Sequence, residues 1–80
     1  MHANLPELTR ELAKALVDYP EDVIVETSGD RDFVRLELEV AEDDLGRVIG
    51  RSGRTARALR IILSAAAEQD GRRCSLDILE

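Results

Sequence analysis

The segment best suited to chemistry is a glycine-bracketed turn, Gly50-Arg51-Ser52-Gly53. Glycine lets the backbone adopt angles that other residues avoid, and it lets a ligand approach without a Cβ in the way. A helix that follows such a turn presents N–H groups that have no partner within the helix and that attract phosphate. Arginine adds a guanidinium group that can bind two phosphate oxygens at once. The turn is therefore a candidate phosphate-binding site.

The charge of the chain is unevenly distributed. The 80 residues carry a net charge of −6, which by itself argues against a nucleic-acid partner because phosphates repel an acidic protein. Residues 45–67 nevertheless hold five arginines and no acid. Residues 1–44 carry thirteen acids against four bases, and residues 68–80 carry four acids against two bases. This local excess of positive charge around the glycine turn favours a nucleic-acid site there.

Three kinds of phosphate-binding loop can be compared with this turn. A P-loop requires Gly-Lys-Ser or Gly-Lys-Thr after a glycine and four residues, and counting from Gly46 the second glycine position holds Arg51. A dinucleotide-binding loop requires glycine where Val48 stands, and it follows a strand rather than a helix. A Gly-x-x-Gly turn between two helices is typical of KH domains, whose loop clamps a short run of nucleotides by their backbone.

The hydrophobic pattern predicts the elements that must position this turn. Asn4 is a suitable helix N-cap, and Pro20 ends the first helix near residue 17 or 18. Alternating apolar residues in the middle of the chain predict an antiparallel hairpin with its turn over residues 28–32. The predicted order is a helix from Asn4, strands over residues 23–27 and 34–40, a short helix that starts at the acidic residues 42–44, a helix from Gly53 to Asp70, and a strand over residues 74–79.

Each predicted element has an apolar face that should point into a common core. In the first helix these residues are Leu5, Leu8, Leu12, Ala15 and Leu16; in the third they are Ala56, Leu59, Ile62, Leu63 and Ala66; in the second strand they are Val34, Leu36, Leu38 and Val40. The aliphatic residues of this strand, together with Ile49, are expected to offer an apolar groove for bases. Tyr19 is expected to pack against the sheet.

The length and the rare residue types exclude several classes of function. Eighty residues predict one domain over 1–80, with residues 1–4 frayed. The single cysteine, Cys74, permits no internal disulfide, which points to the cytoplasm, and it is expected to be a core residue. No apolar run is long enough to span a membrane, and we expect no signal peptide. With His2 as the only histidine, we expect no enzyme activity, no cofactor and no metal site, the acids at 42–44 being residues of a helix start.

At this point the sequence resembles a known family, the single-domain bacterial KH proteins of the KhpA type, over nearly its whole length. The resemblance lies in residues 13–20, Ala-Lys-Ala-Leu-Val-Asp-Tyr-Pro, and in residues 46–60 around the glycine turn. It implies an α+β fold, the type II KH domain, with the order α-β-β-α-α-β and three helices on one face of a three-stranded sheet. It also implies a cytoplasmic RNA-binding protein of the RNA-chaperone type, linked to small-RNA handling, cell division and cell shape. Members resemble one another in forming homodimers and in pairing with a larger KH protein of the KhpB (Jag) type.

The resemblance assigns the RNA-binding loop to Gly50, Arg51, Ser52 and Gly53, with Ile49 before it and Arg54 after it. Gly46 and Arg57 complete the predicted site. For Arg47 and Arg60 the sequence leaves two roles open, which are contact with RNA and ion pairing with acids such as Asp43 and Asp44. The predicted function is weak, salt-sensitive binding of short single-stranded RNA, because two aromatic residues leave little opportunity for stacking on bases. RNA and single-stranded DNA are not distinguished. The alternative is an assembly module that acts mainly as a dimer or heterodimer partner, with residual RNA binding.

Overall fold

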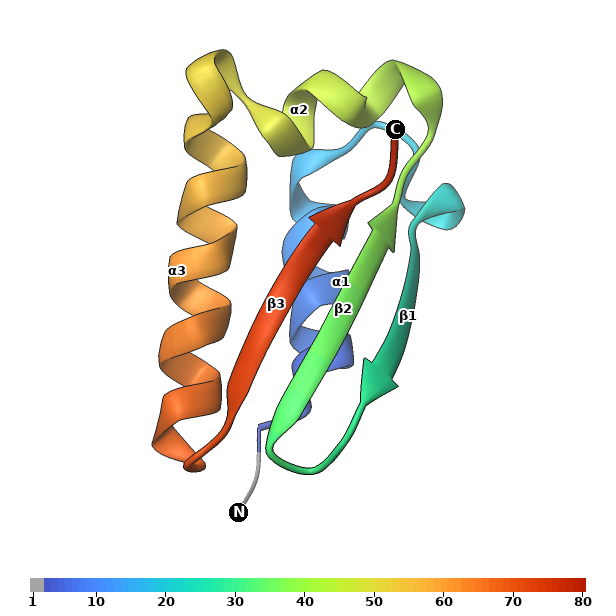
Figure 1. The fold of residues 1–80 in the computed structure, drawn as a ribbon. Coiled ribbons are helices and arrows are strands. Elements are labelled where there is room, and N and C mark those ends of the chain that lie inside the picture. Colours follow the sequence, from blue (N-terminus) through green and yellow to red (C-terminus); the bar gives the residue numbers. More distant parts are fainter. Residues whose placement is uncertain (1–2) are drawn as a thin grey trace.

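The computed structural model describes residues 3–80 and has the predicted order of elements (Figure 1). The helices and strands are α1 (Leu5–Leu16), β1 (Ile24–Gly29), β2 (Phe33–Glu39), α2 (Leu45–Ile49), α3 (Arg54–Gln69) and β3 (Arg73–Ile78). Single turns of 3₁₀ helix cover Pro20–Asp22, Glu42–Asp44 and Arg51–Gly53. The acidic residues 42–44 therefore form a turn of their own directly before α2.

The three strands form one mixed sheet in the order β1-β2-β3. β1 and β2 pair antiparallel, which confirms the predicted hairpin, and β2 and β3 pair parallel. A parallel pair needs a long crossover, and α2 and α3 supply it. Figure 1 shows α1 and α3 on the same face of the sheet and α2 across the end where β2 and β3 finish. The glycine turn therefore lies at that end of the molecule, between α2 and α3.

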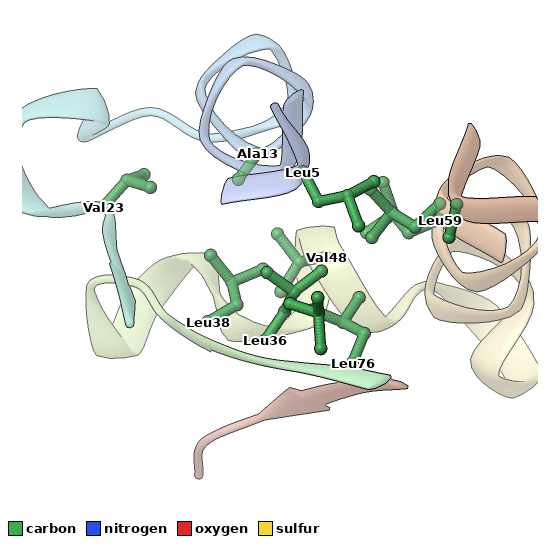
Figure 2. Packing of buried hydrophobic residues seen from close by; sticks show 11 residues of the cluster. Leu5, Ala13, Val23, Leu36, Leu38, Val48, Leu59 and Leu76 are labelled. Carbon is green, nitrogen blue, oxygen red and sulfur yellow. The ribbon is translucent and has the colours of Figure 1, made fainter. Parts of the chain in front are cut away.

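The core between helices and sheet is aliphatic. Leu36 and Leu38 of β2 and Leu76 of β3 point from the sheet toward the helices (Figure 2). Val48 of α2 and Leu59 of α3 meet them from the other side, and Leu36, Leu38 and Val48 are fully buried. Val48, two residues before Gly50, thus anchors the short helix that carries the glycine turn, and burial of one such side chain contributes about 1.5–3 kcal/mol.

The predicted apolar faces of the helices are rotated slightly from the faces that are buried. In α1 the buried residues are Leu5, Thr9 and Ala13, whereas Ala15 is exposed. In α3 Ala67 is buried and Ile62 is 44% exposed. The prediction for Ala15 and Ile62 was wrong because the buried stripe of each helix is rotated from the predicted one, toward Ala13 in α1 and toward Ala67 in α3. The small residues Ala13 and Ala67 are fully buried, and the buried Thr9 hydroxyl donates to the Leu5 carbonyl at 2.8 Å.

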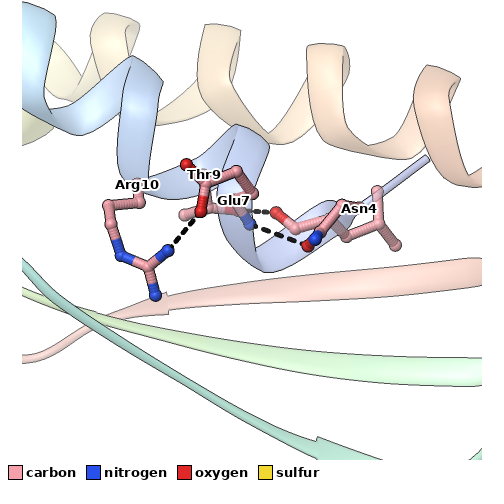
Figure 3. Close-up of polar contacts among 5 residues, drawn as sticks. Asn4, Glu7, Thr9 and Arg10 are labelled. Atoms are coloured by element: carbon pink, nitrogen blue, oxygen red, sulfur yellow. Dashed lines mark hydrogen bonds and ion pairs between the residues drawn. The ribbon is translucent and has the colours of Figure 1, made fainter.

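The start of the chain is better ordered than the sequence indicates. Asn4 caps α1 through its side-chain oxygen, which accepts the Glu7 amide, and Arg10 pairs with Glu7 one turn later (Figure 3). The Ala3 amide donates to a carboxylate oxygen of Asp70 at 2.6 Å. The expectation that residues 1–4 are frayed was therefore wrong for residues 3 and 4. Residues 1 and 2, including His2, lie outside the described part.

Residues 3–80 contain neither a membrane-spanning helix nor a cluster of metal ligands. None of their helices is both long and apolar enough to cross a membrane. No group of three or more His, Cys, Asp or Glu residues in this range is placed to hold a metal ion.

Candidate nucleic-acid interface

The glycine turn joins α2 to α3 through three residues with positive φ. Gly50 ends α2 with φ 78° and ψ 170°, Ser52 has φ 56°, and Gly53 has φ 74°. Serine at positive φ is uncommon, because its Cβ then crowds the backbone. The turn thus holds an unfavourable backbone conformation at the corner where the chain passes from α2 into α3.

The two glycines are required for different reasons. A Cβ at Gly50 would collide with the side chain and the backbone nitrogen of Thr55. A Cβ at Gly53 would meet nothing within 4 Å, so only its left-handed backbone favours glycine there. Gly46, on the exposed side of α2, likewise has open space where a Cβ would be. Thr55 was not among the predicted site residues. Its role is to lie against Gly50 so closely that only glycine fits there, and the sequence alone does not show this contact.

The backbone amides of the turn are only partly used within the protein. The Gly50 amide donates to Gly46, the Gly53 amide to Gly50 and the Arg54 amide to Arg51, all to carbonyl oxygens. No side chain caps the N-terminus of α3, whose N-cap residue is Gly53. Within residues 3–80, no carboxylate accepts a hydrogen bond from this segment. The turn therefore presents a partial positive charge that the protein itself does not neutralise.

The arginines of the segment fall into two groups. Arg51, Arg54 and Arg57 are exposed, and none of them forms an ion pair or hydrogen bond with a side chain of residues 3–80. Arg47 instead pairs with Asp18, at 3.0 Å between Nη2 and Oδ2, and approaches Asp44 at 3.8 Å. Arg60 donates from Nε to the carbonyl of Leu76 at 3.1 Å. The first group can bind phosphate without first breaking an internal contact, and Arg47 cannot.

Asp44 is one of the three acids that the sequence places at a helix start, and it precedes α2 as its N-cap residue, with a further structural role that the sequence does not show. Its side chain is fully buried, and its two oxygens accept the amides of Asp18 and Tyr19, each at 3.0 Å. This ties the chain after α1 to the start of α2. Tyr19 itself is 45% exposed, so the expectation that its ring packs against the sheet was wrong.

The expected apolar groove on β2 does not exist. Val34, Leu36 and Leu38 are buried beneath the helices, because β2 is the central strand and its apolar side faces the core. Ile49 is half-buried beside the glycine turn. A groove of about 260 Å³ lies instead between α3 and the free edge of β3. Its lining consists of Arg60, Leu63, Ser64, Cys74, Ser75 and Leu76.

Cys74 lies in this groove and is partly buried, close to its predicted place in the core. Burial raises the pKa of the Cys74 thiol, and a hydrogen bond donated by the Ser64 hydroxyl to the sulfur and the charge of Arg72 oppose this effect only in part. The thiol is therefore protonated near neutral pH and is a poor nucleophile.

Comparison with known proteins identifies the family. The family model described as KhpA/KhpB, KH domain, matches residues 6–78. The chain belongs to this family. Two relatives named RNA-binding protein KhpA cover almost the whole of both chains. The protein from Halalkalibacterium halodurans is 48% identical over 73 residues, which are 91% of this chain and 96% of the relative. The protein from Leifsonia xyli is 51% identical over 76 residues, which are 94% of this chain and 95% of the relative.

A solved structure confirms the arrangement of the elements. The crystal structure of a variant of Aquifex aeolicus Era bound to GDP.AlF4⁻ superposes with a TM-score of 0.70 over 92% of this chain and 29% of that chain. At 20% identity this likeness shows the fold alone. With the family match, it confirms the prediction of an α+β fold of the type II KH class.

Proposed function

We propose that this KhpA/KhpB-family protein binds short single-stranded RNA through the loop Gly50-Arg51-Ser52-Gly53. The observation that carries the proposal is the exposed glycine turn, whose amides meet no carboxylate of residues 3–80 and whose flanking arginines Arg51, Arg54 and Arg57 have no acidic partner there. The names of the relatives, RNA-binding protein KhpA, support RNA as the ligand.

The roles of the site residues follow from the geometry. Gly50 and Gly53 shape the turn, Gly46 leaves open space on α2, and Ile49 adds apolar surface beside it. A phosphate held by the turn amides accepts further hydrogen bonds from Arg51, Arg54 and Arg57, and Ser52 supplies a hydroxyl at the tip. Because the contacts are made to the backbone of the nucleic acid, binding falls steeply as salt rises.

The decisive experiment reverses the charge of the loop. The double substitution Arg51→Asp with Ser52→Asp places two carboxylates where the phosphate is proposed to bind. We expect at least a tenfold weaker affinity for a short single-stranded RNA, measured by fluorescence anisotropy, and a melting temperature close to that of the unaltered protein because both side chains are exposed.

The hairpin turn between β1 and β2 offers a matched control. Ser28→Asp with Arg31→Asp makes the same change of charge at two exposed residues outside the proposed site. This control should weaken RNA binding only slightly, because it makes the net charge of the protein more negative and leaves the loop unchanged. If the loop variant binds RNA as well as the control does, the loop is not the site.

We further propose that the protein acts in the cytoplasm as an RNA chaperone and that it pairs with a KhpB-type protein. The family model, which covers the KH domains of both KhpA and KhpB, supports this pairing because related domains can share one mode of association. An annealing assay with two complementary RNAs tests the chaperone role. The unaltered protein should accelerate annealing, and the loop double variant should not.

A second candidate function is assembly through the outer face of α3. Ile61 is 64% exposed and Ile62 44% exposed, and the exposed Ala58 and Ala65 extend the same stripe. A second copy of this chain, with its own α3 crossing the first, would cover a stripe of this kind, in which small residues let the two helices approach. Ile61→Lys should convert a dimer to a monomer in analytical ultracentrifugation, whereas Leu79→Lys, at a residue 43% exposed outside α3, should not. Association that persists after nuclease treatment favours direct protein contact over bridging by RNA.

A further inference from the structure

The two edges of the sheet differ in how the rest of the chain covers them. The outer edge of β3 lies beside α3, and Arg60 of α3 donates from Nε to the Leu76 carbonyl at 3.1 Å. β1 forms the opposite edge, and Figure 1 shows it on the far side of the sheet from α3. Within residues 3–80 no strand pairs with the outer edge of β1. This edge is therefore the open one.

The hydrogen-bonding groups on the open edge follow from the register of the hairpin. The Asp30 amide donates to the Phe33 carbonyl at 2.9 Å, one pair beyond the last pair of β1 and β2. Hydrogen-bonded positions alternate along an antiparallel pair, so the even-numbered residues of β1 bond to β2. The amides and carbonyls of Val25 and Thr27 therefore point away from β2, and no turn or loop of residues 3–80 hydrogen-bonds to them.

The sequence of β1 leaves this edge without the usual protection against a further strand. Edge strands are commonly shielded by proline, by lysine or by a bulge that interrupts pairing. The six residues of β1 include neither proline nor lysine, and they pair with β2 in an unbroken register. Ile24, Val25 and Thr27 are β-branched and favour extended backbone. The edge is therefore suited to accept another extended chain.

The face of the sheet that points away from the helices carries a row of carboxylates next to this edge. Glu26 of β1 lies opposite Glu37 of β2, and Glu37 lies opposite Asp77 of β3. Like charges directly opposite each other on adjacent strands are destabilising. None of the three carboxylates forms an ion pair with a base of residues 3–80. A fourth strand on β1 would place a side chain beside Glu26, and a lysine or arginine there would offset the repulsion.

We infer that the edge of β1 binds an extended, basic segment of a partner protein as a fourth strand. Main-chain hydrogen bonds to Val25 and Thr27 attach the segment, and a basic side chain beside Glu26 selects it. A second copy of this chain fits less well, because it would add another Glu26 to the row and because two copies with a net charge of −6 repel each other. The inference does not depend on RNA binding, since β1 and α3 lie on opposite sides of the molecule (Figure 1).

The test uses a six-residue peptide of alternating lysine and valine, acetylated and amidated, which matches the length of β1. Its control is the same peptide with glutamate in place of each lysine. In NMR titrations of the full chain at low salt, the lysine peptide should bind about tenfold more tightly, because its charges complement the carboxylate row. The amide signals of Val25 and Thr27 should shift more than those of Glu26 and Ser28, which already bond to β2. Equal binding of the two peptides, or shifts spread over the other acidic residues, overturns the inference.

Two variants separate the charge contact from the backbone contact. Glu26→Lys should weaken binding of the lysine peptide about tenfold, whereas Glu68→Lys makes the same change of charge at an exposed residue of α3 and should weaken it less than about twofold. Thr27→Pro removes an outward-facing amide and no hydrogen bond to β2, so it should also weaken binding, with the melting temperature as the check on folding. Equal effects of Glu26→Lys and Glu68→Lys contradict a site at β1. Self-association of the unaltered protein that Thr27→Pro abolishes would assign the edge to a second copy and overturn the inference.

Discussion

Two turns of this molecule contain a glycine at which a Cβ would collide with neighbouring atoms. In one turn a carboxylate of the protein accepts hydrogen bonds from the backbone amides, and in the other no carboxylate of the described residues does. In the hairpin turn between β1 and β2, one carboxylate oxygen of Asp30 accepts the amides of Asp32 and Phe33 at 2.9 and 3.0 Å. Gly29 in that turn has a φ of 102°, and a Cβ there would collide with the Phe33 carbonyl. In the turn Gly50–Gly53 no carboxylate of residues 3–80 approaches the backbone. The hairpin turn is closed by the protein itself, and the second turn is open to a ligand.

Side-chain oxygens accept backbone amides at several places in this chain, and the hairpin turn is one of them. Asn4 caps α1, Asp44 binds the two amides that follow α1, and Asp30 binds those of the hairpin. An acidic chain has many carboxylates for this purpose, yet residues 45–67 contain none. The absence of acids near α3 therefore leaves an anion site that the protein itself does not occupy.

The largest effect should come from removing the buried carboxylate. Asp44→Ala leaves the amides of Asp18 and Tyr19 without acceptors, and each hydrogen bond to a charged group contributes about 1.5–3 kcal/mol. We expect a loss of about 3–5 kcal/mol in the free energy of unfolding, measured by urea denaturation. The neighbouring Asp43 is exposed, so Asp43→Ala is the control and should change stability by less than about 0.5 kcal/mol. Equal midpoints for the two variants would show that Asp44 carries no such role.

The two glycines of the open turn should differ in their tolerance of alanine. Gly50→Ala combines a left-handed backbone with a collision against Thr55, so we expect a loss of about 2–3 kcal/mol. Gly53→Ala has the unfavourable backbone conformation but no collision, so its free energy of unfolding should fall by about 1 kcal/mol. Thermal unfolding measures both, because 1 kcal/mol shifts the melting temperature of a domain of this size by about 4–8 °C. A larger loss for Gly53→Ala would contradict the geometry of the turn.

Giving the open turn an acid of its own should make it repel a phosphate. Gly53→Asp places a carboxylate directly before α3, at a left-handed position that aspartate tolerates and where a Cβ meets no other atom. We expect stability within about 1 kcal/mol of the unaltered protein and RNA affinity reduced about tenfold, because the new carboxylate repels the phosphate. Gly53→Asn is the control for the shape of the side chain and should bind RNA more tightly than Gly53→Asp. Full RNA affinity in Gly53→Asp would place the phosphate elsewhere.

Sequence patterns were sufficient for the fold because local signals agreed with one another. The alternation of Val34, Leu36 and Leu38 reflects one buried face of β2, and Gly50 ends α2 with a positive φ that favours glycine. The inward faces of α1 and α3 were less accurate, because the exposed Ile62 is as hydrophobic as a core residue. Which apolar residue is left outside depends on the crossing of α1 and α3, and a single helical pattern does not contain that information.

The site was predictable as a segment and not as a set of contacts. The glycines and Arg51, Arg54 and Arg57 lie together because they are neighbours in the chain. The hydrogen bond from Arg60 to Leu76 joins residues 16 apart, and the groove beside it depends on how α3 packs along β3, so spacing in the sequence could not reveal them. The same holds for Asp44, whose partners lie 25 and 26 residues away.

The smallest effect concerns the closed turn and appears only in acid. Hydrogen bonds from the amides of Phe33 and Asp32 lower the pKa of Asp30 below its ordinary value of 3.8. A carboxyl group with a lowered pKa in the folded state stabilises the fold above the ordinary value, and this contribution is lost as the pH falls through the folded-state pKa. The acid limb of a plot of melting temperature against pH should therefore be shallower below pH 3.8 in Asp30→Asn than in the unaltered protein. Asp32→Asn, an exposed neighbour whose side chain accepts neither amide, should keep the original slope. Because the open turn has no carboxylate to protonate, an acid limb that depended on residues 50–53 instead of Asp30 would contradict the contrast between the two turns.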